Sequence, residues 1–224
     1  VLSPETTSYF LPKSVVIGYN IARIFEPLTR DISQEESPTE LIRRSTPLAA
    51  PIVMMSQDGA EIVLQDVYQI PNEVSLFREH RAERMIDELS GNYSNFIIHK
   101  DGPFYPEELL DIKNIQGSDR LIIPVSIISD LSPRLFSSLA NWNFIPKVGS
   151  VIKLSNEDFL MATPLTTTRY EPRYRGWPNT ILVTIHENAL ENELSSVEKM
   201  QILYQIWSLT RVHPGSQLPT RKPI

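Results

Sequence analysis

The sequence predicts an α/β domain with a mixed central β-sheet flanked by helices. Short apolar runs rich in β-branched residues alternate with longer stretches whose apolar residues recur at helical spacing. Asp58-Gly59 lies between two such apolar runs and indicates a hairpin, because both residues tolerate positive φ. Strands that alternate with helices, together with a hairpin, favour a mixed sheet over a purely parallel one.

The first half of the chain supplies the hairpin and a long helix. Residues 14–24 open with an apolar, β-branched run that predicts a buried strand, and a polar, proline-dotted excursion with a short helix is expected at 26–47. The hairpin strands are expected at 50–55 and 60–67. Residues 73–89 place apolar side chains at helical spacing among many charges, which predicts an amphipathic helix.

The second half continues the alternation and ends in a helix. We expect a strand at 93–99, a helix at 106–115 with proline in its first turn, a strongly β-branched strand at 120–128 and a helical patch after Pro133. Shorter strands follow at 150–154, 159–162 and 180–185. Ser195 or Ser196 caps the last helix, with Glu198 placed to complete a capping box. The apolar face of that helix is expected to consist of Met200, Leu203, Ile206, Trp207 and Thr210.

Composition places the chain among ordinary globular proteins. It has 224 residues, of which 41% are hydrophobic, which fits one large domain over 1–224 or two small ones. The absence of cysteine excludes disulfides, thiolate nucleophiles and cysteine-ligated metals, and suits a reducing, cytoplasmic location. No apolar run approaches the roughly 20 residues needed to span a bilayer, and no signal peptide is visible, so no membrane partner is expected. The net charge of −6 counts against a nucleic-acid binder, although a basic channel can lie on an acidic body.

Two strands end in polar residues that could take part in chemistry. Residues 96–102 (FIIHKDG) bring the carboxylate of Asp101 to the carboxyl end of an apolar strand, where α/β folds place their sites. The alternative is an ordinary Asp-Gly turn. The first strand ends at Asn20, where a two-metal nuclease would need a second carboxylate, and an asparagine oxygen is neutral. The alternative for Asn20 is a turn residue at the end of a strand.

Several other kinds of site find no support. The histidines at 80, 99, 186 and 213 have no metal-binding spacing, and His99 on its apolar strand is expected to be a hydrogen-bonded core residue. There is no Gly-x-Ser-x-Gly elbow for nucleophilic hydrolysis. Neither a P-loop nor a Gly-x-Gly-x-x-Gly run is present, so nucleotide phosphates are not bound by those devices.

Two basic clusters are candidate contacts for nucleic acid. The six cations that we expect to contact phosphate are Arg169, Arg173, Arg175, Arg211, Arg221 and Lys222. Arginine forms bidentate contacts with phosphate, and the aromatic residues between the first three, Tyr170, Tyr174 and Trp177, can stack on bases or riboses. The alternative is a solvated loop whose aromatic side chains fix it to the body of the protein.

These segments, in this order, resemble the PIWI domain of the Argonaute family. Residues 99–102 (HKDG) are similar to the family's His-Arg-Asp-Gly, and Glu107 and Glu108 follow as the acidic start of the next helix. Residues 16–21 (VIGYNI) stand where the family has an apolar-Gly-x-Asp strand. This resemblance implies an RNase H-like fold.

The resemblance continues through the second half of the chain. Residues 132–136 (SPRLF) are similar to a Pro-Arg-Leu-Phe-like segment, and 146–151 (PKVGSV) to a Pro-x-x-Gly-Thr-x entry into a strand, with 159–160 in the strand after it. Residues 206–211 (IWSLTR), followed by Leu-Pro at 218–219, resemble the Tyr-x-Leu-Thr helix and the Leu-Pro beyond it. The match therefore extends over nearly the whole sequence.

The family's cleavage site uses Mg²⁺ or Mn²⁺ held by four carboxylates, and only one of the four is intact here. Asp101 matches, whereas Asn20 stands in place of the first aspartate. The glutamate of the set should fall near 67–69 (VYQ), where Asp66 and Glu73 flank the place out of register. The fourth ligand is expected beyond the last residue of the sequence. The resemblance thus implies that Asn20 and Asp101 are vestiges and that the protein holds no catalytic metal.

The function implied is guide-directed binding of nucleic acid without cleavage, in prokaryotic defence alongside a partner effector. The guide-anchoring MID domain and the N-terminal regions are expected to come from a partner chain or a longer parent, with Mg²⁺ only at a guide 5′-phosphate where a MID domain is present. One alternative is an active metal-dependent nuclease, with Asn20 engineered or the site rebuilt from Asp66 or Glu73. Another is a module that binds no nucleic acid and offers only an interaction surface, with the helix near Trp207 as its face.

Overall fold

The structure is a computed structural model, and its described part forms one sheet with helices on both faces. The described residues are 11–24, 46–55, 61–64, 68–69, 81–128, 135, 146–163 and 179–209. The predicted helical patch after Pro133, apart from Leu135, and residues 26–45 of the predicted excursion lie outside this set. The excursion was expected to extend to residue 47, which is wrong, because residues 46 and 47 belong to a strand.

The sheet is mixed, as the sequence predicts. Its nine strands are β1 (Ser14–Ile24), β2 (Thr46–Met55), β3 (Glu61–Leu64), β4 (Tyr68–Gln69), β5 (Asn95–Asp101), β6 (Leu121–Ile128), β7 (Val151–Lys153), β8 (Asp158–Thr163) and β9 (Asn179–Ile185). They follow the order β3-β2-β1-β5-β6-β9-β8-β7, with β4 beside β2. The central pairs β1–β5 and β5–β6 are parallel, and the other pairs are antiparallel.

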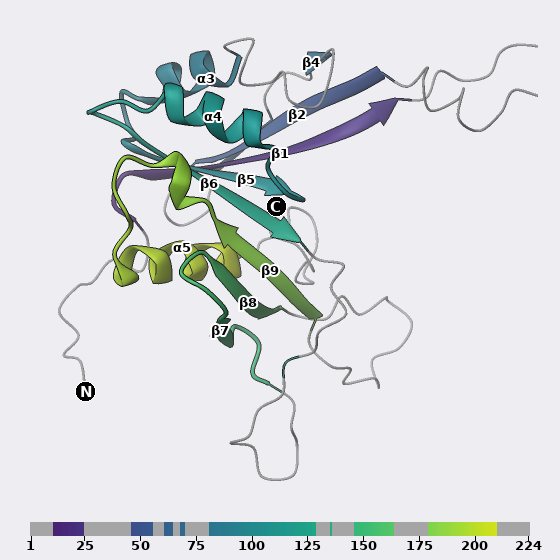
Figure 1. Ribbon diagram of the computed structural model, residues 1–224. Coiled ribbons are helices and arrows are strands. Elements are labelled where there is room, and N and C mark those ends of the chain that lie inside the picture. The colour runs from purple at the N-terminus through teal and green to yellow at the C-terminus, as the bar shows by residue number, and fades with distance from the viewer. Residues whose placement is uncertain are drawn as a thin grey trace, which may run out of the picture.

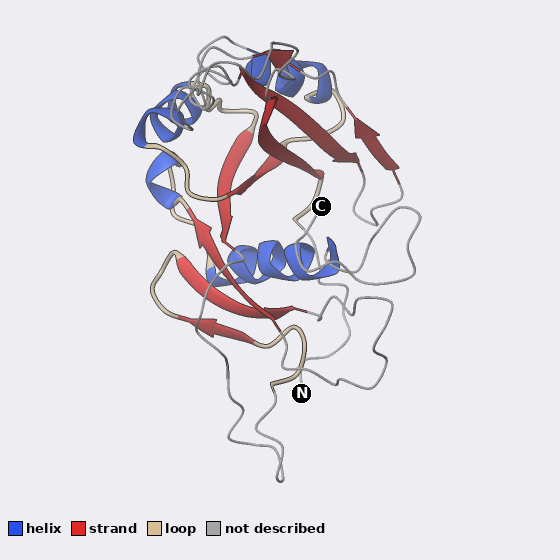
Figure 2. Cartoon of the chain, turned by 90° about the vertical axis from the view of Figure 1, so that its right-hand side faces the viewer, coloured by secondary structure: helices blue, strands red, loops and turns tan. Residues whose placement is uncertain are grey.

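Helices cover both faces of the central strands. Helices α3 (Arg81–Leu89) and α4 (Pro106–Asn114) lie on one face, and α5 (Ser196–Leu209) lies on the other (Figures 1 and 2). Successive side chains of β5 point to opposite faces, so Phe96 joins the cluster under α3 and α4 while Ile97 joins the cluster under α5. Burial on both faces explains why these strands are continuous apolar runs rather than alternating ones.

The helix ends and strand ends follow local signals in most places. Ser195 and Glu198 form the predicted capping box: the Glu198 carboxylate accepts the Ser195 N–H at 2.7 Å, and the Ser195 hydroxyl accepts the Glu198 N–H at 3.2 Å. Strand β5 begins two residues later than expected and runs on to Asp101. The expectation that Met200 belongs to the buried face of α5 is wrong, because that side chain is exposed.

Two short elements have no counterpart in the sequence prediction. They are β4, which pairs with β2, and the 3₁₀ turn η1 (Glu187–Ala189). Within the described part, no helix is both long and apolar enough to cross a membrane, and α5, with 14 residues, is its longest helix.

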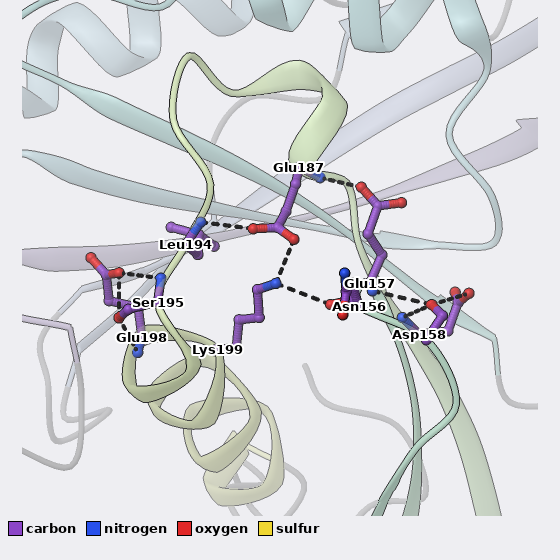
Figure 3. Close-up of polar contacts among 9 residues, drawn as sticks. Asn156, Glu157, Asp158, Glu187, Leu194, Ser195, Glu198 and Lys199 are labelled. Atoms are coloured by element: carbon purple, nitrogen blue, oxygen red, sulfur yellow. Dashed lines mark hydrogen bonds and ion pairs between the residues drawn. The ribbon is translucent and has the colours of Figure 1, made fainter.

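A polar network joins the start of α5 to the turn between β7 and β8 (Figure 3). The Lys199 ammonium forms an ion pair with Glu187 and donates to the carbonyl oxygen of Asn156 at 3.1 Å. The other oxygen of Glu187 accepts the N–H of Leu194 at 2.7 Å, and the Glu187 N–H donates to Glu157 at 2.9 Å. These contacts fix α5 against the antiparallel end of the sheet.

The turn before β7 requires a glycine at position 149. Its φ is +87°, a conformation that costs a residue with a Cβ atom. A Cβ there would also lie 2.9 Å from Nε1 of Trp207 on α5. The glycine of the Pro-x-x-Gly pattern at 146–149 is therefore required by the backbone conformation of the turn and by its packing against α5.

Candidate nucleic-acid interface

The parallel pairing of β1 with β5 brings the two predicted site positions together at the edge of the sheet where β5 ends. These strands are parallel neighbours with Tyr19 opposite Lys100, so the next residues, Asn20 and Asp101, lie at the same level on adjacent strands. The side chain of Asp101 is exposed. The interpretation of Asn20 as the end of the first strand is wrong, because β1 continues to Ile24 and Asn20 pairs with Ala50 of β2.

A buried ion pair lies directly beneath this edge. Lys100, 6% exposed, pairs through its ammonium group with the carboxylate of Glu108, which is 0% exposed and belongs to α4. The same Glu108 oxygen accepts the N–H of Tyr105 at 2.7 Å. Since both charges are removed from water, each depends on the other for its stability.

The segment that follows Asp101 is fixed at several points. Gly102, with φ at +104°, donates its N–H to the carbonyl oxygen of Ile127 at 3.0 Å. The N–H of Phe104 donates to the hydroxyl of Ser126 at 3.2 Å. Each of these bonds ties the loop to β6, so the backbone beyond Asp101 has a defined path.

Ser126 also contacts a histidine from the end of β9. The Ser126 hydroxyl lies 2.7 Å from Nε2 of His186, whose ring meets the Phe104 ring edge-on at 5.4 Å between centroids. Burial lowers the pKa of His186, and the nearby Lys100 charge lowers it further against the attraction of Asp158. In the neutral tautomer without a hydrogen on Nε2, the ring would accept a hydrogen bond from the Ser126 hydroxyl, whose oxygen accepts the N–H of Phe104.

His99 departs from the sequence prediction in one respect. It is a core residue as expected, only 5% exposed, but neither ring nitrogen has a hydrogen-bond partner within the described part of the chain. Burial lowers its pKa to about 3. A neutral, unpartnered imidazole is suited to packing here and not to holding a charge beside Asp101.

The predicted phosphate contacts fall outside the described residues. Those positions are Arg169, Arg173, Arg175, Arg211, Arg221 and Lys222, together with the alternative metal ligands Asp66 and Glu73. Among the residues that the structure does describe, no group of three or more His, Asp or Glu is arranged to hold a metal ion. The contacts of the six cations remain predictions from the sequence.

A cavity of about 350 Å³ lies at the opposite end of the parallel strands, beside the first residues of β5 and β6. Its ionisable side chains are Asp119, Glu191, Glu193, Glu198 and Arg120. The single cation already pairs with Asp87. This excess of carboxylates disfavours phosphate, so the cavity is not a candidate contact for a nucleic-acid backbone.

Sequence reasoning missed the polar groups that support this edge. The Lys100–Glu108 pair could have been suspected, because a lysine inside an apolar strand needs a buried anion. Ser126 and His186 are 60 residues apart and carry no local signal.

Comparisons with known proteins show which solved structures share this fold. No protein-family model and no curated protein sequence matches the chain. Among solved structures it is similar to A. aeolicus Argonaute, with a TM-score of 0.59 and 22% identity, over 94% of this chain and 26% of that one.

Two further Argonaute structures are similar to this chain over the same part of their length. Marinitoga piezophila Argonaute with a 5′ OH guide RNA gives a TM-score of 0.54 and 17% identity over 94% of this chain and 28% of that one. Clostridium butyricum Argonaute bound to a guide DNA and a target DNA gives a TM-score of 0.56 and 19% identity, over 93% of this chain and 25% of that one. The chain thus spans about a quarter of the Argonaute chains that it matches. Its fold is the α/β, RNase H-like fold of the PIWI region of prokaryotic Argonautes.

Proposed function

We propose that this chain is the PIWI-type part of an Argonaute-like protein, and that it binds a guide–target duplex without cutting it. The observation that carries the proposal is the pairing of β1 with β5, which puts Asn20 level with Asp101. In a two-metal nuclease of this fold, that neighbouring position would carry a second carboxylate.

The donors at this edge do not fit a pair of divalent ions. Two ions about 4 Å apart need several anionic oxygens to offset their charge. Asn20 and Asp101 supply one negative charge between them, and an amide oxygen holds Mg²⁺ less well than a carboxylate does. The Glu108 carboxylate cannot supply the missing charge, because it is fully buried against Lys100. We therefore assign no hydrolytic step to this site.

Binding is supported by the fold and by the basic clusters of the sequence. The Marinitoga piezophila structure contains guide RNA, and the Clostridium butyricum structure contains guide DNA and target DNA. Recognition by backbone contacts would leave sequence specificity to base pairing. The arginines at 169, 173 and 175 can neutralise phosphates despite the net charge of −6.

The other parts of an Argonaute would complete the function. We propose that a MID domain and N-terminal regions, on a partner chain or in a longer protein, anchor the guide, with Mg²⁺ at its 5′-phosphate. We also propose a role in defence in the cytoplasm, in which a partner protein supplies the effector activity.

The arginine cluster gives the first prediction. Replacing Arg169, Arg173 and Arg175 together with alanine should weaken binding of a short guide–target duplex about tenfold or more, because three cations no longer bond to phosphate. The slope of log K against log salt should become shallower by about 0.9 for each phosphate that is no longer neutralised. Filter binding between low and physiological salt measures both quantities.

The matched control is the triple lysine variant at the same three positions. It keeps the charges and should retain the salt slope, with weaker binding only where bidentate geometry matters. If the affinity of the unchanged protein is indifferent to salt, the proposed mode of binding is wrong.

A second prediction concerns the missing carboxylate. Asn20→Asp should not create guide-dependent cleavage in the presence of Mn²⁺. Two aspartates, without the glutamate that completes the family's metal site, still carry too little negative charge to hold two divalent ions. The assay incubates labelled target with guide and protein and resolves the products on a gel. Cleavage by Asn20→Asp that disappears in Asn20→Asp with Asp101→Asn would favour the nuclease alternative, as would any cleavage by the unchanged protein.

A further inference from the structure

Most of the large hydrophobic side chains that are exposed in the described part of the chain lie at one rim of the domain. There are eight of them, and two belong to α4 and its N-cap. The other six lie on β7, on the residues that flank it and on α5; they are Val148, Ile152, Leu154, Val197, Met200 and Tyr204. These six residues form the β7–α5 rim. Exposed apolar side chains that gather in one place commonly mark a contact with another molecule.

The two elements of the rim lie side by side. The Trp207 indole of α5 lies against Gly149, just before β7, and the Lys199 ammonium donates to the carbonyl oxygen of Asn156, just after it. Helix α5 therefore runs antiparallel to β7 and along its whole length, on one face of the sheet. Val151 packs against the hydrophobic cluster under α5, so Ile152 points to the opposite face.

The outer face of α5 carries no free charge. The two charged residues of the helix lie in its first turn, where Glu198 bonds the Ser195 hydroxyl and Lys199 pairs with Glu187. Residues 200–209 include no charged side chain. A helix that is largely apolar on both faces is typical of one that is covered on both. The exposed side chains of Val197 and Met200 are therefore suited to a contact with protein.

Strand β7 offers an open backbone edge beside these side chains. It is the last strand of the sheet and has a neighbour on one side only among the described strands (Figure 1). The carbonyl oxygen of Ser150 and the N–H of Leu154 each bond to the main chain of β8, at 2.9 Å. Because these groups alternate along an antiparallel strand, the N–H and C=O groups of Val151 and Lys153 point to the open edge. An open edge of this kind is a template for another strand.

The edge is complementary to a second copy of itself. In an antiparallel pair with a twofold axis at Ile152, Val151 of each copy lies opposite Lys153 of the other, and the two residues exchange N–H···O bonds. An axis at Lys153 would instead place two like charges directly opposite each other. With the axis at Ile152, the two isoleucine side chains meet on one face of the joined sheet, and the uncharged outer faces of α5 lie on the other.

We propose that this chain forms a twofold-symmetric dimer, in which β7 pairs antiparallel with β7 of a second copy and the two β7–α5 rims pack together. The sheet then continues from one copy into the other. Strands β6, β9 and β8 separate β7 from β5, so the dimer leaves the edge at Asp101 accessible. The inference is independent of the proposed function, because the contact needs no nucleic acid.

The absence of cysteine from the 224-residue chain allows a direct test of the register. Ile152→Cys places one thiol of each copy at the axis, where paired Cα atoms are about 4.5 Å apart, close enough for a disulfide. Leu154→Cys is the matched control on the same strand, because its Cα atoms would be about 13 Å apart. Under mild oxidation Ile152→Cys should form a cross-linked dimer about tenfold faster than Leu154→Cys or Leu110→Cys. Non-reducing gel electrophoresis measures the rates.

Sedimentation equilibrium without nucleic acid measures the association itself. The parent should be a dimer, and Ile152→Lys or Met200→Glu should raise its dissociation constant about tenfold or more, because each sets like charges against each other. Leu110→Glu, on the outside of α4, should stay within about twofold.

Thermal melts establish that each variant is folded, and the conservative Ile152→Cys still decides the outcome if Ile152→Lys does not fold. A parent that stays monomeric up to about 100 μM overturns the proposal, because a standard interface binds well below that concentration. A dimer that persists in Ile152→Lys and Met200→Glu also overturns it, as does equal cross-linking of Ile152→Cys and Leu110→Cys.

Discussion

Glu108→Ala should lower the free energy of unfolding by about 3–5 kcal/mol, because it leaves the buried ammonium of Lys100 without its anion. The same carboxylate also accepts the N–H of Tyr105, so the substitution removes that hydrogen bond as well. Urea denaturation followed by circular dichroism measures the change. A reduction of this size is a large fraction of the roughly 5–15 kcal/mol that stabilises an ordinary domain.

Two controls separate the ion pair from a general effect of substitution in α4. Glu107→Ala removes the adjacent carboxylate, which is exposed, and should change the stability by no more than about 0.5 kcal/mol. Lys100→Met combined with Glu108→Leu replaces the pair by apolar side chains of similar volume and should recover most of the stability. Equal stability of Glu108→Ala and Glu107→Ala would show that Lys100 does not depend on Glu108.

Periodicity predicted the architecture because the core strands are buried on both faces. Val15 and Ile17 pack under α3 and α4 while Val16 packs under α5, so β1 begins with a continuous apolar run that can be recognised in the sequence. The hairpin of β2 and β3 and the capping box at Ser195 were predicted by equally local rules. The two-residue strand β4 has no such signal, because a pairing this short depends only on its neighbour.

The candidate site was predictable in part for the same reason. Asp101 ends an apolar strand, and the parallel pairing that brings Asn20 level with it follows from the α/β pattern. The partners of the loop beyond Asp101 come from α4, β6 and the end of β9, and tertiary packing alone decides which of their side chains meet. His99 was expected to be hydrogen-bonded, and nothing in the sequence indicated that its ring nitrogens would find no partner among the described residues.

That unpartnered ring makes the protein sensitive to acid. Burial lowers the pKa of His99 from 6.5 to about 3, so the unfolded chain takes up a proton at higher pH than the folded one. The contribution of the neutral His99 ring to stability is therefore fully present above about pH 6.5 and is lost as the pH falls towards 3, because protons favour the unfolded state, which binds more of them. The decrease attributable to His99 should be about 2–3 kcal/mol between about pH 6.5 and 4.5, and about 4–5 kcal/mol by about pH 3.

His99→Leu isolates this effect from the other titrating groups. Leucine fills a similar volume and removes two buried polar atoms, so the variant should be at least as stable as the parent at about pH 7. Its advantage should then grow by about 1.4 kcal/mol per pH unit below about pH 6, since a single proton is no longer taken up on unfolding. Urea denaturation of both proteins at several pH values measures the difference. Parallel curves for the two proteins between about pH 6.5 and 4.5 would mean that His99 is solvated or paired when it is protonated, because only an unsolvated ring gives the variant a growing advantage in acid.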